Sequence, residues 1–217
     1  MITRLIDRPD GFEIVRDQVA AILATEQANQ QALATAAGKD PSPWALNVYQ
    51  ERSNPWEQYL NNQNDLTPIV NVWFDSASYD QGAGGVVDRQ CSDAIINIDC
   101  YGCGVSTDDG DDNTAGDTAA ALNAQRALRL VRNIIMASEY TYLDLRGFVG
   151  GRMPQSIKAF QPQTSAPTVQ QIVATRLALK VRHNEFSPQY EYETLETLAA
   201  TVKRSGDGRI LIQTEYQ

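Results

Sequence analysis

The three cysteines and the one histidine are the residues of this chain that could bind a transition metal. Cys100 and Cys103 are separated by two residues, Cys91 lies upstream, and His183 lies far downstream. Three thiolates and one imidazole suit a tetrahedral Zn²⁺ ion, but the second closely spaced ligand pair of a structural zinc site is missing. A redox Cys-x-x-Cys motif would need a helix to start directly after it. We therefore expect reduced, buried thiols and no metal cofactor.

Two glycine clusters could bind phosphate groups through their backbone. Gly102-Cys103-Gly104 lies between a predicted strand and a predicted helix, as a dinucleotide-binding turn does, but the third glycine is absent. The acidic residues that follow would repel a pyrophosphate. Gly82-Ala83-Gly84-Gly85 lacks the Lys-Ser/Thr ending of a phosphate-binding loop. The sequence therefore predicts no nucleotide cofactor.

An acidic segment between these two predicted elements could supply carboxylate oxygens to Ca²⁺. Counted from Asp111, the sixth position is Gly116, as a calcium loop requires, but the twelfth is Leu122 instead of a bidentate glutamate. We therefore expect a solvated acidic loop, and opportunistic ion binding stays open. The carboxylates of this loop belong to Asp108, Asp109, Asp111 and Asp112.

Nucleophilic catalysis has little support in the sequence. A single histidine excludes mechanisms that need two and leaves little for a catalytic triad. We expect His183 on the polar face of its strand, near a solvated strand end. No Gly-x-Ser-x-Gly nucleophile elbow is present. The sequence therefore predicts no active site and a protein that is not an enzyme.

Three arginines at a spacing of three residues lie on the second predicted helix. Arg126, Arg129 and Arg132 would form a basic ridge that drifts slowly around that helix. Two interpretations stay open. The ridge is either a solvated helix face or a subunit interface that binds acidic groups of a neighbouring copy, because arginine is favoured at interfaces.

Two helices and a helical turn are predicted from apolar spacing and capping residues. The first helix runs from Gly11 to Ala37 and ends before the Gly38 and proline signals that follow. A single turn is predicted from Pro55 to Leu60. The second helix runs from about Ala119 to Ser138, with an N-cap at Asp117 or Thr118. Its expected buried stripe consists of Leu122, Leu128, Val131 and Ile135.

Alternating apolar residues predict the strands. They cover Pro68–Asp75, Ala94–Tyr101, about Ser156–Phe160, and Val169–Phe186. We expect the first two to pair antiparallel across a loop from Ser76 to Gly85, with Ile96, Ile98 and Cys100 on the apolar face of the second. The C-terminal segments, Thr194–Lys203 and Arg209–Tyr216, flank a Gly/Asp-rich connector and predict a β-hairpin arm.

These elements predict an α+β fold, with a mostly antiparallel sheet packed against an N-terminal and a central helix. We expect one domain over residues 1–217, with an inserted segment at about 41–67 and an arm at about 188–217. The 217 residues are 42% hydrophobic and 21% charged, as in ordinary folded proteins. The net charge of -9 argues against tight DNA binding. The chain shows no signal peptide or membrane-spanning run, so we expect a soluble protein.

Several segments, in this order along the chain, carry a resemblance to a known family. They are Thr67-Pro68-Ile69-Val70-Asn71-Val72-Trp73, Ile96-Asn97-Ile98-Asp99-Cys100-Tyr101-Gly102, Ala127-Leu128-Arg129-Leu130-Val131-Arg132-Asn133-Ile134, and the strand from Ala174 to Glu185. With the N-terminal helix and the late arm, this succession resembles bacteriophage tail-terminator and neck proteins. The segment from Trp44 to Asn64 departs from the smaller members of that family.

The resemblance implies a subunit of a ring, typically a hexamer, that caps the finished tail tube and joins it to the neck connector. In that family no residue is catalytic. Tube, connector and, in a contractile tail, sheath subunits would be partners, and DNA would pass through the lumen without sequence-specific binding. The protein would be assembled in the host cytoplasm and reside in the virion. The acidic loop at Asp108–Asp112 and the terminal hairpin would face the lumen or a partner.

Three other interpretations stay open. The first is another neck component, such as a collar, stopper or head-completion protein, which would share the size, acidity and ring symmetry. The second is a tail-assembly factor that is absent from the finished particle. The third is a small metal- or nucleotide-binding enzyme, which would depend on the glycine and acidic clusters described above.

Overall fold

The computed structural model describes residues 7–62, 65–80, 89–109, 112–162, 171–186, 198–203 and 210–216. The chain divides into two compact units. One is the body, Asp7–Phe186, and the other consists of Met1–Ile6 with Ser187–Gln217. The described part of the second unit is a two-stranded antiparallel hairpin of β8 (Leu198–Lys203) and β9 (Ile210–Tyr216), which agrees with the predicted C-terminal hairpin.

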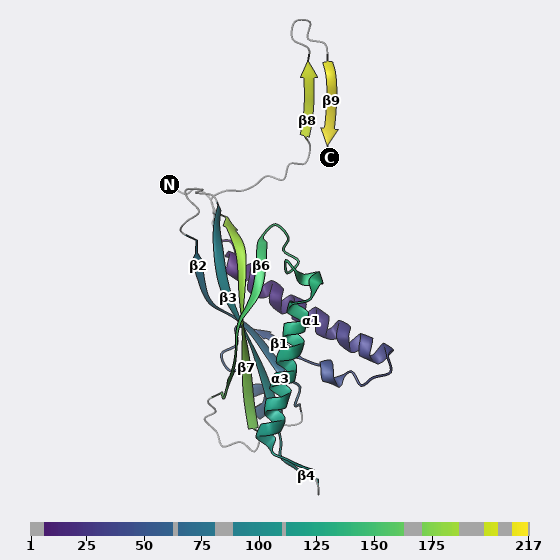
Figure 1. Cartoon of the computed structure of the whole chain (residues 1–217), viewed down its shortest axis with the longest axis vertical. Coiled ribbons are helices and arrows are strands. Elements are labelled where there is room, and N and C mark those ends of the chain that lie inside the picture. Colours follow the sequence, from purple (N-terminus) through teal and green to yellow (C-terminus); the bar gives the residue numbers. More distant parts are fainter. Residues whose placement is uncertain are drawn as a thin grey trace. The chain divides into compact units, whose positions relative to one another are not determined.

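A five-stranded sheet with the order β1-β2-β3-β7-β6 forms the centre of the body (Figure 1). Only β1 and β2 pair in parallel, and the other neighbours are antiparallel. The strands are β1 (Asn47–Gln50), β2 (Ile69–Tyr79), β3 (Arg89–Gly104), β6 (Val149–Phe160) and β7 (Gln171–Phe186). The predicted α+β class and the antiparallel pairing of the strands that include Val72 and Ile98 are confirmed.

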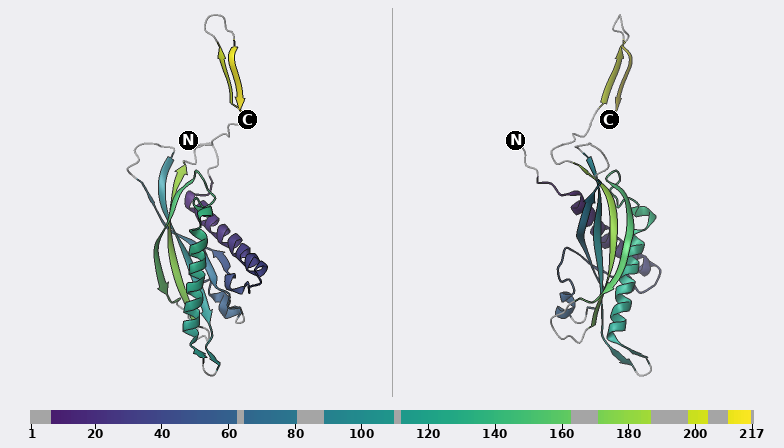
Figure 2. Two further views of the ribbon diagram at one scale, coloured as in Figure 1. Left: turned by 45° about the vertical axis from the view of Figure 1, so that its right-hand side comes forward. Right: turned by 60° about the vertical axis from the view of Figure 1, so that its left-hand side comes forward.

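Two long helices, α1 (Gly11–Ala36) and α3 (Gly116–Ile135), pack against one face of this sheet (Figure 2). A short helix, α2 (Glu57–Asn61), belongs to the inserted segment and matches the predicted turn. Two 3₁₀ turns, η1 (Ser42–Trp44) and η2 (Ser138–Tyr140), and a small hairpin of β4 (Thr107–Asp109) and β5 (Asp112–Thr114) complete the described elements of the body. No helix among the described residues is long and apolar enough to span a membrane.

The core lies between the two helices and the sheet. Ile96 and Ile98 of β3 are fully buried against Leu128 and Val131 of α3, as predicted, and Val19 of α1 joins them. A smaller cluster on the opposite face of the sheet gathers around Tyr59, Ile69, Tyr101, Cys103 and Ala174. Both faces of β3 are therefore covered in its C-terminal half, which explains why even its polar side chains are buried there.

The predicted buried stripe of α3 is wrong at Leu122, which is 60% exposed. The rotation of the helix is decided by two glycines of β3. A Cβ atom on Gly102 would lie 2.2 Å from the carbonyl oxygen of Ala120, and one on Gly104 would lie 2.3 Å from that of Gly116. The helix backbone touches the strand backbone there, so small residues face the sheet and Leu122 points away from it.

The ends of α3 also differ from the prediction. The helix begins at Gly116, with Ala115 and not Asp117 in the N-cap position, and Ser106 accepts a hydrogen bond from the Gly116 amide at 3.0 Å. The helix ends at Ile135 and not at Ser138. Its last carbonyls are capped from the sheet, because the Arg152 guanidinium of β6 donates to the carbonyl oxygens of Ile135 and Ala137, the latter at 2.6 Å.

Three strands are longer than predicted. Strand β3 runs from Arg89 to Gly104 and extends beyond the predicted Ala94–Tyr101 at both ends. Strand β2 continues to Tyr79, so the predicted loop from Ser76 is wrong for its first residues, while 81–85 lie outside the described residues. Strand β6 begins at Val149 and not near Ser156. The glycines and Pro154 in this stretch do not predict a strand, but edge strands tolerate such residues at bulges. The register shifts between Val149 and Gly151 and again between Pro154 and Ser156.

Candidate functional site

The two cysteines of the Cys-x-x-Cys motif lie on opposite faces of β3. Cys100 belongs to the core beneath the helices, and Cys103 belongs to the smaller cluster on the other face. Residues three apart in a strand point in opposite directions, so the two thiols cannot share one ion. Burial raises the pKa of both thiols, to about 11 for Cys103. The prediction of buried free thiols is confirmed for this pair, while Cys91 is half-buried.

His183 lies in the interior, and the prediction of a solvated position is wrong. It is 1% exposed, because it shares its strand face with Val181 and lies under the start of α1. A Cβ atom on Gly11 would be 2.5 Å from its Nε2, and its ring stacks on Phe148 at 5.4 Å. Its Nε2 lies 3.6 Å from the Glu185 carboxylate, but among the described residues neither ring nitrogen forms a hydrogen bond. We therefore interpret this histidine as a packing residue that supports the helix N-terminus.

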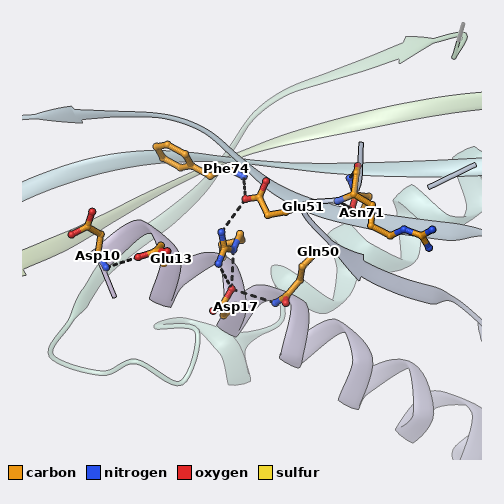
Figure 3. Close-up of polar contacts among 9 residues, drawn as sticks. Asp10, Glu13, Asp17, Gln50, Glu51, Asn71 and Phe74 are labelled. Atoms are coloured by element: carbon orange, nitrogen blue, oxygen red, sulfur yellow. Dashed lines mark hydrogen bonds and ion pairs between the residues drawn. The ribbon is translucent and has the colours of Figure 1, made fainter. Parts of the chain in front are cut away.

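A polar network joins α1 to the edge of the sheet (Figure 3). Glu51, at the end of β1, accepts hydrogen bonds from Arg16 of α1 at 3.1 Å and from the Phe74 amide at 3.0 Å. Asp17 pairs with Arg16 at 2.8 Å, and this hydrogen bond is the main cause that raises the pKa of Arg16. Gln50 donates to the same aspartate at 3.4 Å. The inserted segment is therefore fastened to the body at its first strand.

An ion pair between a buried carboxylate and a partly exposed arginine, on the opposite face of the sheet, was not predicted from the sequence. Asp99 of β3 is 3% exposed and pairs with Arg176 of β7, its direct neighbour across the strands. The guanidinium donates through Nε at 2.6 Å and through an Nη atom at 2.9 Å. The Trp73 indole donates to the same carboxylate at 3.0 Å, and the Tyr101 hydroxyl donates at 3.3 Å. The buried charge is therefore fully satisfied within the chain.

Aromatic rings enclose this ion pair. The Arg176 guanidinium carbon lies 4.7 Å from the Trp73 ring centroid and 5.1 Å from that of Phe160. The carboxylate of Asp99 raises the pKa of Arg176 above its ordinary value, and burial together with this carboxylate raises the pKa of Tyr101. The cluster therefore links β2, β3, β7 and β6 across one face of the sheet through charge and stacking.

A concavity of about 340 Å³ opens beside this cluster, between the sheet and the inserted segment. The Asn71 side chain fixes the backbone of Arg52 at its rim. It accepts a hydrogen bond from the Arg52 amide at 3.1 Å and donates one to the Arg52 carbonyl oxygen at 2.9 Å. The Arg52 guanidinium lies 4.5 Å from the Tyr49 ring centroid. Trp56 lines the same hollow. Its walls combine aromatic rings with two guanidiniums, of Arg52 and Arg176, and two carboxylates, of Glu51 and Asp99. This mixed aromatic and charged surface suits contact with another molecule.

Tyr59 anchors the inserted segment at the other end of this hollow. Its side chain is 1% exposed, and its hydroxyl accepts from the Ile69 amide at 3.1 Å. The hydroxyl also lies 2.9 Å from the Thr67 carbonyl and 3.0 Å from the Tyr101 carbonyl, to which it can donate. Burial raises the pKa of this tyrosine. Through these bonds the described residues of the inserted segment form an integral part of the body.

The predicted arginine ridge divides into two kinds of residue. Arg129 and Arg132 are exposed on α3, while Arg126 is half-buried and its Nε has no hydrogen-bond partner among the described residues. Within the same described part of the chain, none of the three forms an ion pair. Both interpretations, solvated face and interface with a neighbouring copy, therefore remain compatible with the geometry.

The acidic segment contains two short antiparallel strands, β4 and β5. The backbone register pairs Asp108 with Asn113 and Asp109 with Asp112. Asp111 lies outside the described residues. The described residues contain no group of three histidine, cysteine or acidic side chains arranged to hold a metal ion. Whether these carboxylates face a lumen or a partner stays a prediction.

No known protein-family model matches this chain, and no curated protein matches its sequence. We therefore infer the function from the chain itself, namely from the order of its elements, its net charge and the open edges of its described strands.

Proposed function

We propose that this chain is a structural virion protein that forms a ring at the head–tail interface of a bacteriophage. In this position it terminates the tail tube and joins it to the neck connector. The proposal follows the order of elements that resembles tail-terminator and neck proteins. The α+β body provides the compact unit that such a ring would repeat.

The observation that carries the proposal is the separate C-terminal hairpin. Strands β8 and β9 pair with each other and form a two-stranded sheet among the described strands. They belong to a compact unit distinct from the body. A hairpin of two strands is at best marginally stable in water, and three strands or a packed surface are needed to stabilise it. Such an element acquires its stability from another surface, as an assembly arm does.

The charges of the chain agree with a ring through which DNA passes. The net charge of -9 gives the protein a surface that repels phosphates on average, so a moving duplex would not adhere to it. The exposed guanidiniums of Arg129 and Arg132 are local exceptions on α3. In a ring they would lie against acidic groups of the neighbouring copy, where arginine pairs readily with carboxylates.

The oligomeric state of the purified chain tests the proposal. Light scattering coupled to gel filtration is expected to give six times the mass of one chain at micromolar concentration, and negative-stain images are expected to show rings. Mass spectrometry of purified phage particles is expected to detect the protein. A stable monomer at all concentrations, or absence from the particle, contradicts the proposal and favours the assembly-factor alternative.

A further inference from the structure

Strand β6 forms a long open edge of the main sheet. It is the last strand in the order β1-β2-β3-β7-β6 and, among the described strands, pairs with β7 alone. An edge strand carries a row of unpaired backbone N–H and C=O groups that another strand can use. Met153 and Ile157 on this strand are 56% and 52% exposed. The other edge, β1, is a strand of only four residues.

The two halves of β6 differ in their ability to accept another strand. The first half contains two bulges and Pro154, features that natural edge strands use to prevent pairing. From Ser156 to Phe160 the register with β7 runs without a break over five residues, from Ala178 to Ala174. The second half is therefore a regular template at the open side of the sheet.

Strand β9 has the composition of a strand that could pair with residues 156–160 of β6. Its seven residues, Ile-Leu-Ile-Gln-Thr-Glu-Tyr, are rich in β-branched and aromatic types and contain no glycine or proline. Its partner β8 is shorter and contains two alanines. Among the described strands β9 pairs with β8 alone, so the backbone N–H and C=O groups on its other side are available to a further strand.

We propose that β9 of one copy pairs with residues 156–160 of β6 in the neighbouring copy and extends its five-stranded sheet. The inference rests on the proposed ring function and names the partner of the arm. Joining β9 to β6 uses two different surfaces, and such head-to-tail contacts form a ring when the rotation from one copy to the next closes. Pairing of β6 with β6 would instead be two-fold symmetric and stop at a dimer. Backbone hydrogen bonds supply the affinity, as in other cases of strand addition.

Proline substitutions in the full-length chain test this pairing. Adjacent residues of β9 alternate between directing their N–H toward β8 and away from it. Of the variants Gln213→Pro and Thr214→Pro, one removes a bond within the hairpin and the other removes a bond on its outer side. We expect both variants to abolish the ring. If the outer edge of β9 had no partner strand, the variant that changes this edge would still assemble. Gly151→Ala, at a position with open space around it, is the matched control.

Hydrogen exchange measured by mass spectrometry locates the contact. In the assembled wild-type ring, peptides covering residues 156–160 are expected to exchange about tenfold more slowly, or slower still, than in the two proline variants. If the ring forms but these peptides exchange at the same rate in the wild type and in both proline variants, the pairing is overturned and the proposed function is not affected. A wild-type chain that never assembles overturns both.

A cross-linking experiment distinguishes pairing between copies from pairing within one chain. Lys158→Cys and Glu215→Cys are made in separate chains that also carry Cys91→Ser, and the two proteins are mixed and treated with a short bismaleimide. A covalent dimer that needs both substitutions supports the proposal. Cross-linking only when both cysteines are in the same chain, without dimer formation, refutes it.

Discussion

Removal of the Arg176 guanidinium is expected to cost the body about 3 kcal/mol of unfolding free energy, at the lower end of the range for a buried charge left without its partner, because Arg176 itself is 33% exposed. The change is Arg176→Met, which keeps a long apolar side chain. It would leave the Asp99 carboxylate, whose side chain is 4% exposed, without its two strongest hydrogen bonds. The Trp73 and Tyr101 donors remain but cannot neutralise the charge.

A second pair between the same two strands provides the matched control. Lys180 of β7 lies 2.8 Å from Asp93 of β3, but that carboxylate is 25% exposed. The Oδ1 atom of Asp93 is already buried without a partner, so Lys180→Met exposes only the rest of this carboxylate to water. The expected cost is about 1 kcal/mol, well below that of Arg176→Met. Urea unfolding at one fixed protein concentration, followed by tryptophan fluorescence, measures both variants, since assembly would otherwise shift the apparent stability.

Adding Asp99→Asn to Arg176→Met tests the cause of the loss. If the cost comes from an orphaned buried charge, the double variant is expected to be more stable than the single one, because the amide is neutral. Equal losses for Arg176→Met and Lys180→Met, or a double variant that is less stable than the single, would refute the reasoning.

Three further predictions concern other parts of the body. Gly102→Ala is expected to lower the free energy of unfolding in urea by about 3 kcal/mol, because its Cβ would lie 2.2 Å from the backbone of α3. Gly151→Ala, where a Cβ meets open space, should be near neutral, and equal effects of the two variants would contradict the close packing. Arg129→Glu is expected to leave a folded monomer by light scattering if the ridge is an interface, and an unchanged oligomer assigns it to solvent. Cys103, whose pKa is raised to about 11 by burial, should react with iodoacetamide at pH 8 far more slowly than half-buried Cys91, and comparable rates would contradict the burial.

The elements with a strong period could be predicted from the sequence. Apolar spacing located α1 to within one residue at its C-terminal end, and alternation located the middle of β2, β3 and β7. These elements bury one face each, so local pattern and tertiary environment agree. Ile98 and Val131 were correctly assigned to the core for the same reason.

The positions that were missed depend on contacts between distant segments. Leu122 is exposed because Gly102, on another element, determines which side of α3 touches the sheet. The pairing of Asp99 with Arg176 needs the register between β3 and β7, which no local pattern contains. A signal was nevertheless present, since an aspartate inside an apolar strand requires a partner if both faces are covered.

A cryo-EM reconstruction of the phage neck would locate the ring that we propose at the top of the tail tube. We expect density for the α+β body in a closed ring at the upper end of the tube, with each C-terminal hairpin extending the sheet of the next copy. Density for this chain at another position in the neck, or none in the particle, would contradict the proposal.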